Sequence, residues 1–231
     1  LTCEALGGGG RADSLASLTE IPHNGSLIVD DIEDGAVTRR GGPAIHLEYG
    51  VDLAVNMGNL MYFLPSLILE KGVLNEGVRA AMTRDWLAVM RRLHLGQGYD
   101  ILWHREKTLF PDRESYLRMC RFKTGSLSSL AARLGSRAAL GNGPTATGGS
   151  PAGSFSRTSY NAPVTSYDAV ASTSILDQVG LPAGGEEALI DMLGEAWESF
   201  GTRFQILDDV QNLSTGIPGK DRGDDIVEGK K

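Results

Sequence analysis

The stretch Ser26-Leu-Ile-Val-Asp-Asp-Ile-Glu-Asp-Gly-Ala-Val-Thr-Arg-Arg-Gly-Gly-Pro43 governs the interpretation of the whole chain. Four carboxylates, Asp30, Asp31, Glu33 and Asp34, follow directly on an apolar run. In a helix, Asp30 and Asp34 point the same way at about 5 Å. Like charges at that distance repel by roughly 3 kcal/mol at an intermediate dielectric. We therefore expect a cation between them; the alternative is a solvated acidic turn at a helix end.

The residues after the acidic turn indicate which cation and which ligand to expect. Mg²⁺ is held by one or two carboxylates, with phosphate oxygens and water completing its octahedron. Arg39 and Arg40 follow the acidic turn, and a guanidinium group binds phosphate through two parallel hydrogen bonds. Acidic and basic residues together predict a magnesium-diphosphate site.

A second acidic cluster repeats the first far down the chain. In the stretch 204–213 an apolar run leads to the tandem Asp208-Asp209, and Asn212 adds an oxygen ligand four residues after Asp208. Two such helices facing each other across a cavity would hold metal ions with a diphosphate between them. The repeat favours a metal site over a solvated turn.

Six signatures carry a family resemblance. They are Asp30-Asp31-x-x-Asp34, Arg39-Arg40-Gly41-x-Pro43-x-x-His46, Gly96-Gln97-Gly98-x-Asp100, Lys123-Thr124-Gly125, Phe204-Gln205-x-x-Asp208-Asp209, and Gly219-Lys220-x-x-Gly223-x-Asp225-x-x-Glu228-Gly229-Lys230. In this order they resemble the trans-isoprenyl diphosphate synthases, and within them the eukaryotic geranylgeranyl diphosphate synthases. The resemblance runs from about Cys3 to the end of the chain, apart from one insertion.

The resemblance implies a fold and an activity. The expected fold is all-α, a single bundle of mostly antiparallel helices around a central cavity. The expected activity is that of a Mg²⁺-dependent prenyltransferase with three ions per site. It would condense isopentenyl diphosphate with an allylic diphosphate, 1′-4 and head to tail, and would act as a homodimer.

The resemblance also assigns roles to single residues. It implies metal binding by Asp30, Asp34 and Asp208, with Asp31, Asp209 and Asn212 as further candidates. Diphosphate binding is expected from Arg39, Arg40, Lys123, Gln205, Lys220 and Lys230. The expected catalytic set is Lys123, Thr124 and Gln205, since the Thr124 hydroxyl and the Gln205 amide would stabilise the allylic cation through their dipoles.

Product length should depend on what blocks the growing prenyl tail beneath the first acidic cluster. Gly25 and Ser26, about one turn before Asp30, are too small to stop it. In the resembled synthases a Tyr-Phe pair and a histidine form the lower stop, and Tyr62, Phe63 and His94 match them. We therefore expect a C20 product, geranylgeranyl diphosphate; the alternative is that both aromatic residues simply pack between helices.

The apolar spacing predicts one helical domain over residues 1–231. Helices are expected at 1–6, 11–34, 44–71 with a kink at Pro65, 76–105, 113–140 and 186–213, followed by a loop at 214–231. Residues 141–185 are rich in Gly, Ser, Thr and Pro and lack periodicity, so they are expected to form a disordered insertion. The resembled family has a Gly-Lys-x-x-Arg-Pro signature upstream and further helices downstream, so the chain is expected to be incomplete at both ends.

Composition limits the partners and the compartment. A net charge of −7 repels nucleic acid and anionic lipid. The apolar stretch 51–69 contains Asp52, Asn56 and Asn59, so we expect a core helix and no membrane span. Two cysteines provide no disulfide framework. A cytoplasmic protein is expected, although a targeting segment could precede this sequence, which lacks an initiator Met.

Two other functions remain open at this level. A class I terpene cyclase is also all-α and has an acidic cluster, but it needs no second isoprenoid-diphosphate site, so the Arg39-Arg40 pair and the tandem aspartates favour condensation. A non-catalytic subunit of a heteromeric synthase would explain the absent upstream signature. Against it, the expected metal-binding positions are all present.

Overall fold

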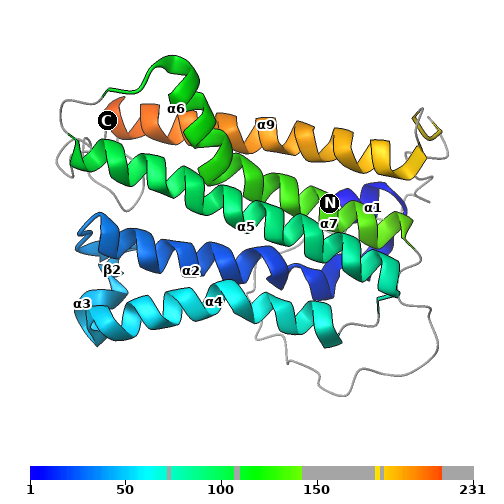
Figure 1. Cartoon of the computed structure of the whole chain (residues 1–231), viewed down its shortest axis with the longest axis horizontal. Helices are drawn as coiled ribbons and strands as arrows, with labels where there is room; N and C mark the ends of the chain where they lie inside the picture. The colour runs from blue at the N-terminus through cyan, green and yellow to red at the C-terminus, as the bar shows by residue number, and fades with distance from the viewer. Residues whose placement is uncertain (72–73, 107–109, 142–179, 183–184, 215–231) are drawn as a thin grey trace, which may run out of the picture.

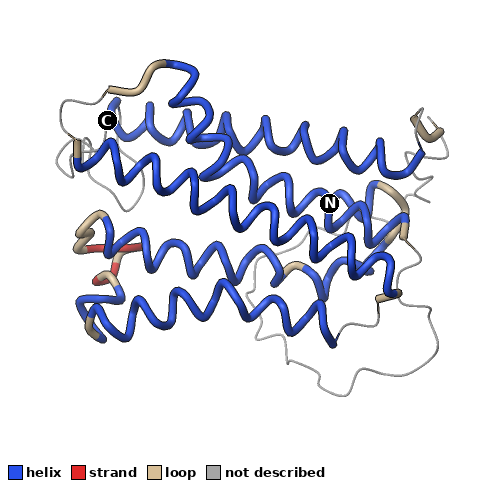
Figure 2. Tube along the Cα trace, in the orientation of Figure 1, coloured by secondary structure: helices blue, strands red, loops and turns tan. Residues whose placement is uncertain are grey.

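The computed structural model describes residues 1–71, 74–106, 110–141, 180–182 and 185–214. The described chain is almost entirely helical, with one short hairpin (Figure 2). The elements are α1 Thr2–Ala5, the 3₁₀ helix η1 Gly9–Leu15, α2 Ser17–Glu33, β1 Thr38–Arg39, β2 Gly42–Pro43, α3 Ile45–Tyr49, α4 Val51–Lys71, α5 Glu76–Arg105, α6 Arg113–Cys120, the π-turn η2 Arg121–Gly125, α7 Ser126–Leu140 and α9 Gly185–Ser214. The all-α prediction is confirmed.

The long helices reverse direction from one to the next, as the colour gradient in Figure 1 shows. Helices α2 and α4 form one closely packed pair, and α5, α7 and α9 lie above it in that view. The C-terminal ends of α2, α5 and α9 therefore lie at the same end of the bundle as the hairpin. Helix C-termini carry partial negative charge, so this end of the molecule needs cations.

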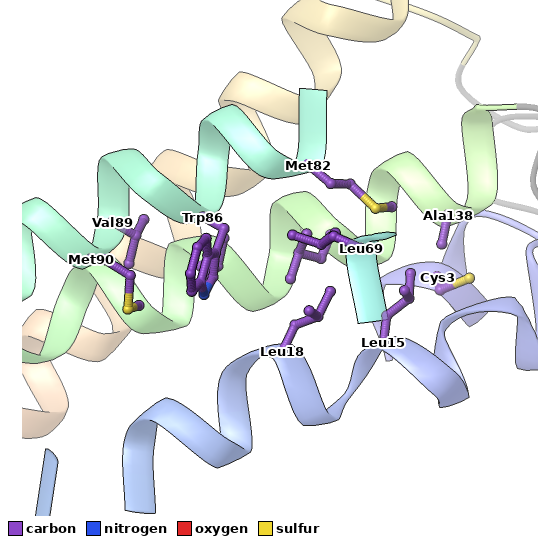
Figure 3. Packing of buried hydrophobic residues seen from close by; sticks show 11 residues of the cluster. Cys3, Leu15, Leu18, Leu69, Met82, Trp86, Val89, Met90 and Ala138 are labelled. Atoms are coloured by element: carbon purple, nitrogen blue, oxygen red, sulfur yellow. The ribbon is translucent and has the colours of Figure 1, made fainter. Parts of the chain in front are cut away.

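The main hydrophobic core lies towards the opposite end of the bundle. It joins the first turns of α2 to α5 and α7, with Trp86 and Met82 at its centre (Figure 3). A smaller cluster of Trp103, Met119 and Cys120 packs beneath the acidic end, with Tyr99, Tyr116 and Ile206 against it. Each end of the bundle is thus stabilised by its own hydrophobic cluster.

Backbone chemistry explains several element boundaries. The side chain of Asn75 caps α5 by accepting a hydrogen bond from the Val78 amide at 2.8 Å, and Asp112 caps α6 in the same way. The hairpin turns through Arg40 and Gly41, both with positive φ (53° and 81°). A left-handed pair is what a two-residue hairpin requires, so Arg40, which has a side chain, is held in a strained conformation.

Among the described residues, the predicted helical segments occur in the expected order, but three of the six are divided into shorter elements. The helix expected at 11–34 begins as the 3₁₀ turn η1, and the one at 44–71 is broken at Gly50, where φ is 90°. Helix α4 then continues through Pro65. The 113–140 helix contains the π-turn η2. Most of the insertion expected at 141–185, and the expected loop after residue 214, lie outside the described residues.

Helix α4 differs most from its expected environment. By length and composition its residues Val51–Glu70 could cross a membrane, and only 17% of that window is buried. It was predicted to be a core helix, yet much of its apolar surface is exposed: Leu53, Met57, Leu60, Phe63 and Leu67 lie on its outer side. The prediction was wrong for this outer face because the stretch contains more apolar residues than one buried stripe needs. The expected absence of a membrane span stays a prediction.

Candidate active site

A cavity of about 1590 Å³ lies between α2, α4, α5, the α6–α7 helix and α9. Asp30 of α2 lines it, as do Asp208 and Asp209 of α9. Side chains from both acidic clusters therefore line one cavity, as the sequence predicts. Apolar side chains, among them Leu27, Leu93, Leu127 and Ala131, line the rest of the hollow.

The π-turn places Lys123 and Thr124 on the cavity wall. Their backbone can approach α5 closely because Gly96 has no side chain: a Cβ there would lie 2.5 Å from the Lys123 nitrogen. Gly125, at the end of the turn, packs in the same way against α9, where its Cβ would lie 2.7 Å from the Glu198 carbonyl oxygen. Such π-turns are frequent at functional sites, and here two glycines fix this one between its neighbours.

Lys123 joins the first acidic cluster to α5. Its ammonium lies 3.1 Å from Asp30 and 2.5 Å from Asp100. Although burial alone would lower the pKa of Lys123, Asp30 and Asp100 raise it above its ordinary value. The Gln97 amide donates to Asp30 at 2.9 Å and to Glu33 at 2.8 Å. Burial raises the pKa of Glu33, against the effect of that hydrogen bond.

Arg39 neutralises the buried carboxylate of the first cluster. Asp31 is only 2% exposed, and the Arg39 Nε donates to it at 2.8 Å, with a second contact from Nη2. The same guanidinium lies 3.6 Å from Asp30. Burial acts to lower the pKa of Arg39, but Asp31 raises it above its ordinary value. Arg40 also lines the cavity, from the strained hairpin turn.

A chain of hydrogen bonds crosses the cavity wall from α6 to the π-turn. The Tyr116 hydroxyl donates to Asp209 at 2.5 Å, and the Gln205 amide donates to the other oxygen of Asp209 at 2.9 Å. Thr124 completes the chain, because its hydroxyl donates to the Gln205 carbonyl oxygen at 2.5 Å. The predicted pair Thr124 and Gln205 are therefore in direct contact.

The predicted metal ligands do not all line the cavity. Asp34 is the C-terminal cap of α2 and is absent from the cavity wall, although its charge acts on Arg39. Asn212 is fully buried at 0% exposure and lies outside the wall. The i+4 spacing suggested otherwise for Asn212, but the last turns of α9 carry that side chain into protein. Lys220 and Lys230 lie outside the described residues.

The donor set nevertheless suits magnesium held together with a substrate. Among the described residues, no three His, Cys, Asp or Glu side chains are grouped closely enough to hold an ion alone. Mg²⁺ does not require such a group, because it takes one or two carboxylates and fills its shell with phosphate oxygens and water. Asp30 and Asp208, on two helices that line one cavity, supply hard oxygen ligands of that kind.

Tyr62 and His94 occupy the apolar part of the cavity. Their rings meet edge to face, with centroids 4.8 Å apart, and both line the wall beside Ser26. The His94 Nδ1 lies 2.8 Å from the Met90 carbonyl oxygen, which fixes the ring. Burial, followed by the charge of Glu33, raises the pKa of Tyr62 to about 12. Two of the three predicted stop residues thus line the cavity and contact each other.

Two residues predicted to line the pocket lie elsewhere. Gly25 is buried against α4, where a Cβ would lie 2.8 Å from both the Gly58 carbonyl oxygen and the Met61 Cβ. Its small size serves helix packing and opens no space in the cavity. Phe63 is 66% exposed on the outer side of α4 and does not line the wall. Consecutive helical residues point about 100° apart, and here Tyr62 faces the cavity while Phe63 faces outwards.

Comparisons with known proteins agree with this geometry. The family model "Polyprenyl synthetase" matches residues 1–147. The chain belongs to the polyprenyl synthetase family. It is 31% identical over 215 residues to a geranylgeranyl pyrophosphate synthase of Epichloe festucae (strain Fl1), covering 92% of this chain and 48% of that protein. The match to the Clitopilus passeckerianus enzyme of the same name is 42% identical over 115 residues, or 48% of this chain and 33% of that protein.

A solved structure agrees with the fold of this chain. The chain matches the geranylgeranyl pyrophosphate synthetase of Pyrococcus horikoshii Ot3 with a TM-score of 0.72 and 25% identity, covering all of this chain and 59% of that one. The family resemblance read from the six signatures is confirmed. The chain spans a third to a half of the length of the two curated relatives above.

Sequence reasoning gave no role to four side chains of the candidate site. Glu33, Gln97, Asp100 and Tyr116 all line the cavity and bond to predicted site residues. Gln97 and Asp100 stand in a quoted signature at i, i+3, a spacing that puts them on one helix face. Tyr116 precedes Lys123 by seven residues, two helical turns, and that spacing was the only available signal.

Proposed function

We propose that this protein is a Mg²⁺-dependent prenyltransferase that condenses isopentenyl diphosphate with an allylic diphosphate to give geranylgeranyl diphosphate. One observation carries the proposal: Asp30 and Asp208, on opposite helices, line the same cavity as Lys123, Arg39 and an apolar interior. A prenyl diphosphate has the matching chemistry, a multiply charged anionic head on a hydrocarbon tail. The family membership and the names of the relatives support the same reaction and do not favour a terpene cyclase.

The residues of this chain would prepare the diphosphate head to leave. Asp30 and Asp208 are the lining residues that would hold magnesium, which would neutralise the diphosphate when bound. Lys123 and Arg39 bring positive charge to the cavity wall beside Asp30. Arg40 also lines the cavity and would bind the diphosphate of the second substrate. Cations fixed before the reaction stabilise charge on the leaving group without reorganisation.

The hydroxyl of Thr124 and the amide of Gln205 would act on the positive charge left behind. Both lie on the cavity wall between the charged rim and the apolar interior. Their oxygens present partial negative charge to an allylic cation, and the surrounding apolar side chains exclude water that would quench it. The Tyr62 and His94 rings would then limit the tail to C20.

Product analysis tests the proposal. The protein would be mixed with Mg²⁺, isopentenyl diphosphate and, in turn, each of the three short allylic primers, and the products measured by mass. The expected product is C20 diphosphate. A hydrocarbon made from geranylgeranyl diphosphate alone would overturn the proposal in favour of a cyclase, and product that appears only with a partner protein would indicate a subunit.

We also propose that the protein forms a homodimer through the outer face of α4. The exposed residues Leu53, Met57, Leu60, Phe63 and Leu67 recur every three or four residues along this helix. Helix α5 adds the exposed Leu87, Leu95 and Leu102. An apolar helix face of this length is typical of a surface that packs against another apolar surface, and a second copy supplies one by symmetry.

A further inference from the structure

Asp209 lies at the centre of a hydrogen-bonded chain that comes from three separate segments. Tyr116 of α6 bonds to its Oδ2 at 2.5 Å, and Gln205 of α9 bonds to its Oδ1 at 2.9 Å. Thr124 of the π-turn bonds to Gln205 at 2.5 Å. The proposed reaction assigns roles to Thr124 and Gln205 and none to Tyr116.

The chain decides which end of the Gln205 amide faces Thr124. An ionised carboxylate only accepts hydrogen bonds, so the NH₂ group of Gln205 must face Asp209. The carbonyl oxygen must then face the Thr124 hydroxyl and the cavity. Without a fixed acceptor at position 209 the amide could turn over, and it would present two N–H groups in place of an electron-rich oxygen.

Tyr116 is well placed to fix the acceptor. Its ring packs against the apolar cluster of Trp103, Met119 and Cys120, so the position of its hydroxyl is set by protein packing. Burial, followed by the hydrogen bond to Asp209, raises the pKa of Tyr116 above its ordinary value. The phenol therefore keeps its proton and acts as a donor to Asp209.

We propose that Tyr116 is a positioning residue for the prenyl transfer: through Asp209 it fixes the orientation of the Gln205 amide, so that the carbonyl oxygen faces Thr124 and the developing allylic cation. This inference rests on the proposed function and adds to it a residue that does not touch the substrate's reacting atoms. It also separates the two aspartates of the second cluster. Asp208 serves the metal and the diphosphate, whereas Asp209 serves Gln205.

The test compares Tyr116→Phe with Tyr99→Phe. Both tyrosines pack against the same apolar cluster, but Tyr99 stacks on Trp103, whereas the Tyr116 hydroxyl donates to Asp209. We expect Tyr116→Phe to lower kcat by about ten- to a hundredfold, the effect of losing a hydrogen bond to a charged group. The KM for both diphosphates should stay close to that of the unaltered protein, because other residues bind the phosphates. Tyr99→Phe should leave kcat unchanged.

A double-mutant comparison distinguishes positioning from simple support of the fold. In a Gln205→Leu background there is no amide to orient, so Tyr116→Phe should produce little further loss of kcat. A full, additive loss in that background would overturn the inference, as would an unchanged kcat for Tyr116→Phe alone. Melting temperatures of all variants identify any that fail to fold. If the unaltered protein makes no prenyl product, the proposed function itself is wrong. If it makes product but Tyr116→Phe does not lower kcat, only the role of Tyr116 is wrong.

Discussion

At the scale of single residues, the candidate site consists of opposite charges that neutralise one another. Lys123 lies between Asp30 and Asp100, and Arg39 lies against Asp31 and Asp30. Leaving such carboxylates unpaired near three helix C-termini would be costly. The same cations are the groups that would contact a diphosphate, so the site is assembled before any substrate arrives.

Tyr62 and Phe63 make a matched pair for the prediction on product length. Tyr62→Ala should give products longer than C20, because it removes the ring that meets His94 at the cavity wall. Phe63→Ala should keep the C20 product, because that ring points out of the bundle. Mass analysis of the products checks both. Longer products from Phe63→Ala, with none from Tyr62→Ala, would reverse the assignment.

The sequence predicted the charged residues of the site better than its apolar floor. Asp30, Lys123, Thr124, Gln205 and Asp208 all line the cavity. The aspartates were predicted from acidic clusters that follow apolar runs, and the other three residues from the family resemblance. Gly25 and Phe63 were misplaced. A small or an aromatic residue suits both a pocket and a helix interface, and periodicity alone does not decide which neighbouring helix it faces.

At the scale of elements, glycines set the distances between the helices that carry the site. Gly96 and Gly98 stand two residues apart on α5, yet a Cβ at position 96 would collide with the π-turn, while one at position 98 would meet nothing within 4 Å. An alanine at position 96 therefore tests the close contact between helices, whereas an alanine at position 98 tests helix propensity alone.

Gly96→Ala is expected to lower both stability and activity. It should reduce the free energy of unfolding by about 1–3 kcal/mol through overpacking and displace Lys123. Gly98→Ala should instead raise it by about 0.5–1 kcal/mol, since alanine favours the helix. Denaturant unfolding and product formation measure both effects. Equal responses of the two variants would contradict this account of Gly96.

The other end of the bundle depends on an ion-pair group around Arg137. This α7 side chain bonds to Asp85 of α5 and to Glu187 of α9, at 2.6 Å and 2.7 Å. Arg92 of α5 and Glu198 of α9 make a second bidentate pair nearer the site. Helix α9 is thereby joined to α5 at two levels along its length and to α7 at one.

Glu187→Gln should make the free energy of unfolding depend less on pH in the acidic range. The hydrogen bond from Arg137 lowers the pKa of Glu187 below its ordinary 4.5. The stabilisation that ionised Glu187 gives to the folded protein is therefore complete above pH 4.5, its pKa in the unfolded chain. It is lost as the pH falls through the lower pKa of Glu187 in the folded protein. Unfolding free energies between about pH 5 and pH 3 should fall less steeply in the variant. Glu186→Gln, at the exposed neighbour, is the control and should keep the original slope.

Helix order was predictable from the sequence, but the interruptions within helices were not. The periodicity of apolar residues identified the long helices from α2 to α9. The apolar spacing predicted one continuous helix across Gly50 and another across 121–125, where the structure has a break and a π-turn. The π-turn packs closely against Gly96 and α9, and such tertiary contacts cannot be predicted from local periodicity.

At the scale of the whole molecule, the bundle has a strongly apolar outer face on α4. Replacing Leu53 and Leu60 together with lysine should convert the proposed dimer into a monomer, because two like charges would meet across the symmetry axis. Light scattering measures the mass. Leu207→Lys, an equally exposed leucine on α9 at the other edge of the bundle, should leave the dimer intact. A monomeric unaltered protein would refute the dimer.

The π-turn restricts how the length of this chain can change. An α-helix advances about 100° and 1.5 Å with every residue, and the turn adds one residue to what would otherwise be a continuous rod from α6 into α7. Removing a residue between Tyr116 and Leu130 would rotate α6 by about 100° relative to α7 and shift it by about 1.5 Å. Tyr116 would leave Asp209, or Leu130 would leave the main core. A single-residue deletion or insertion in this segment should therefore displace one of the two flanking helices, whereas a substitution acts only at its own position.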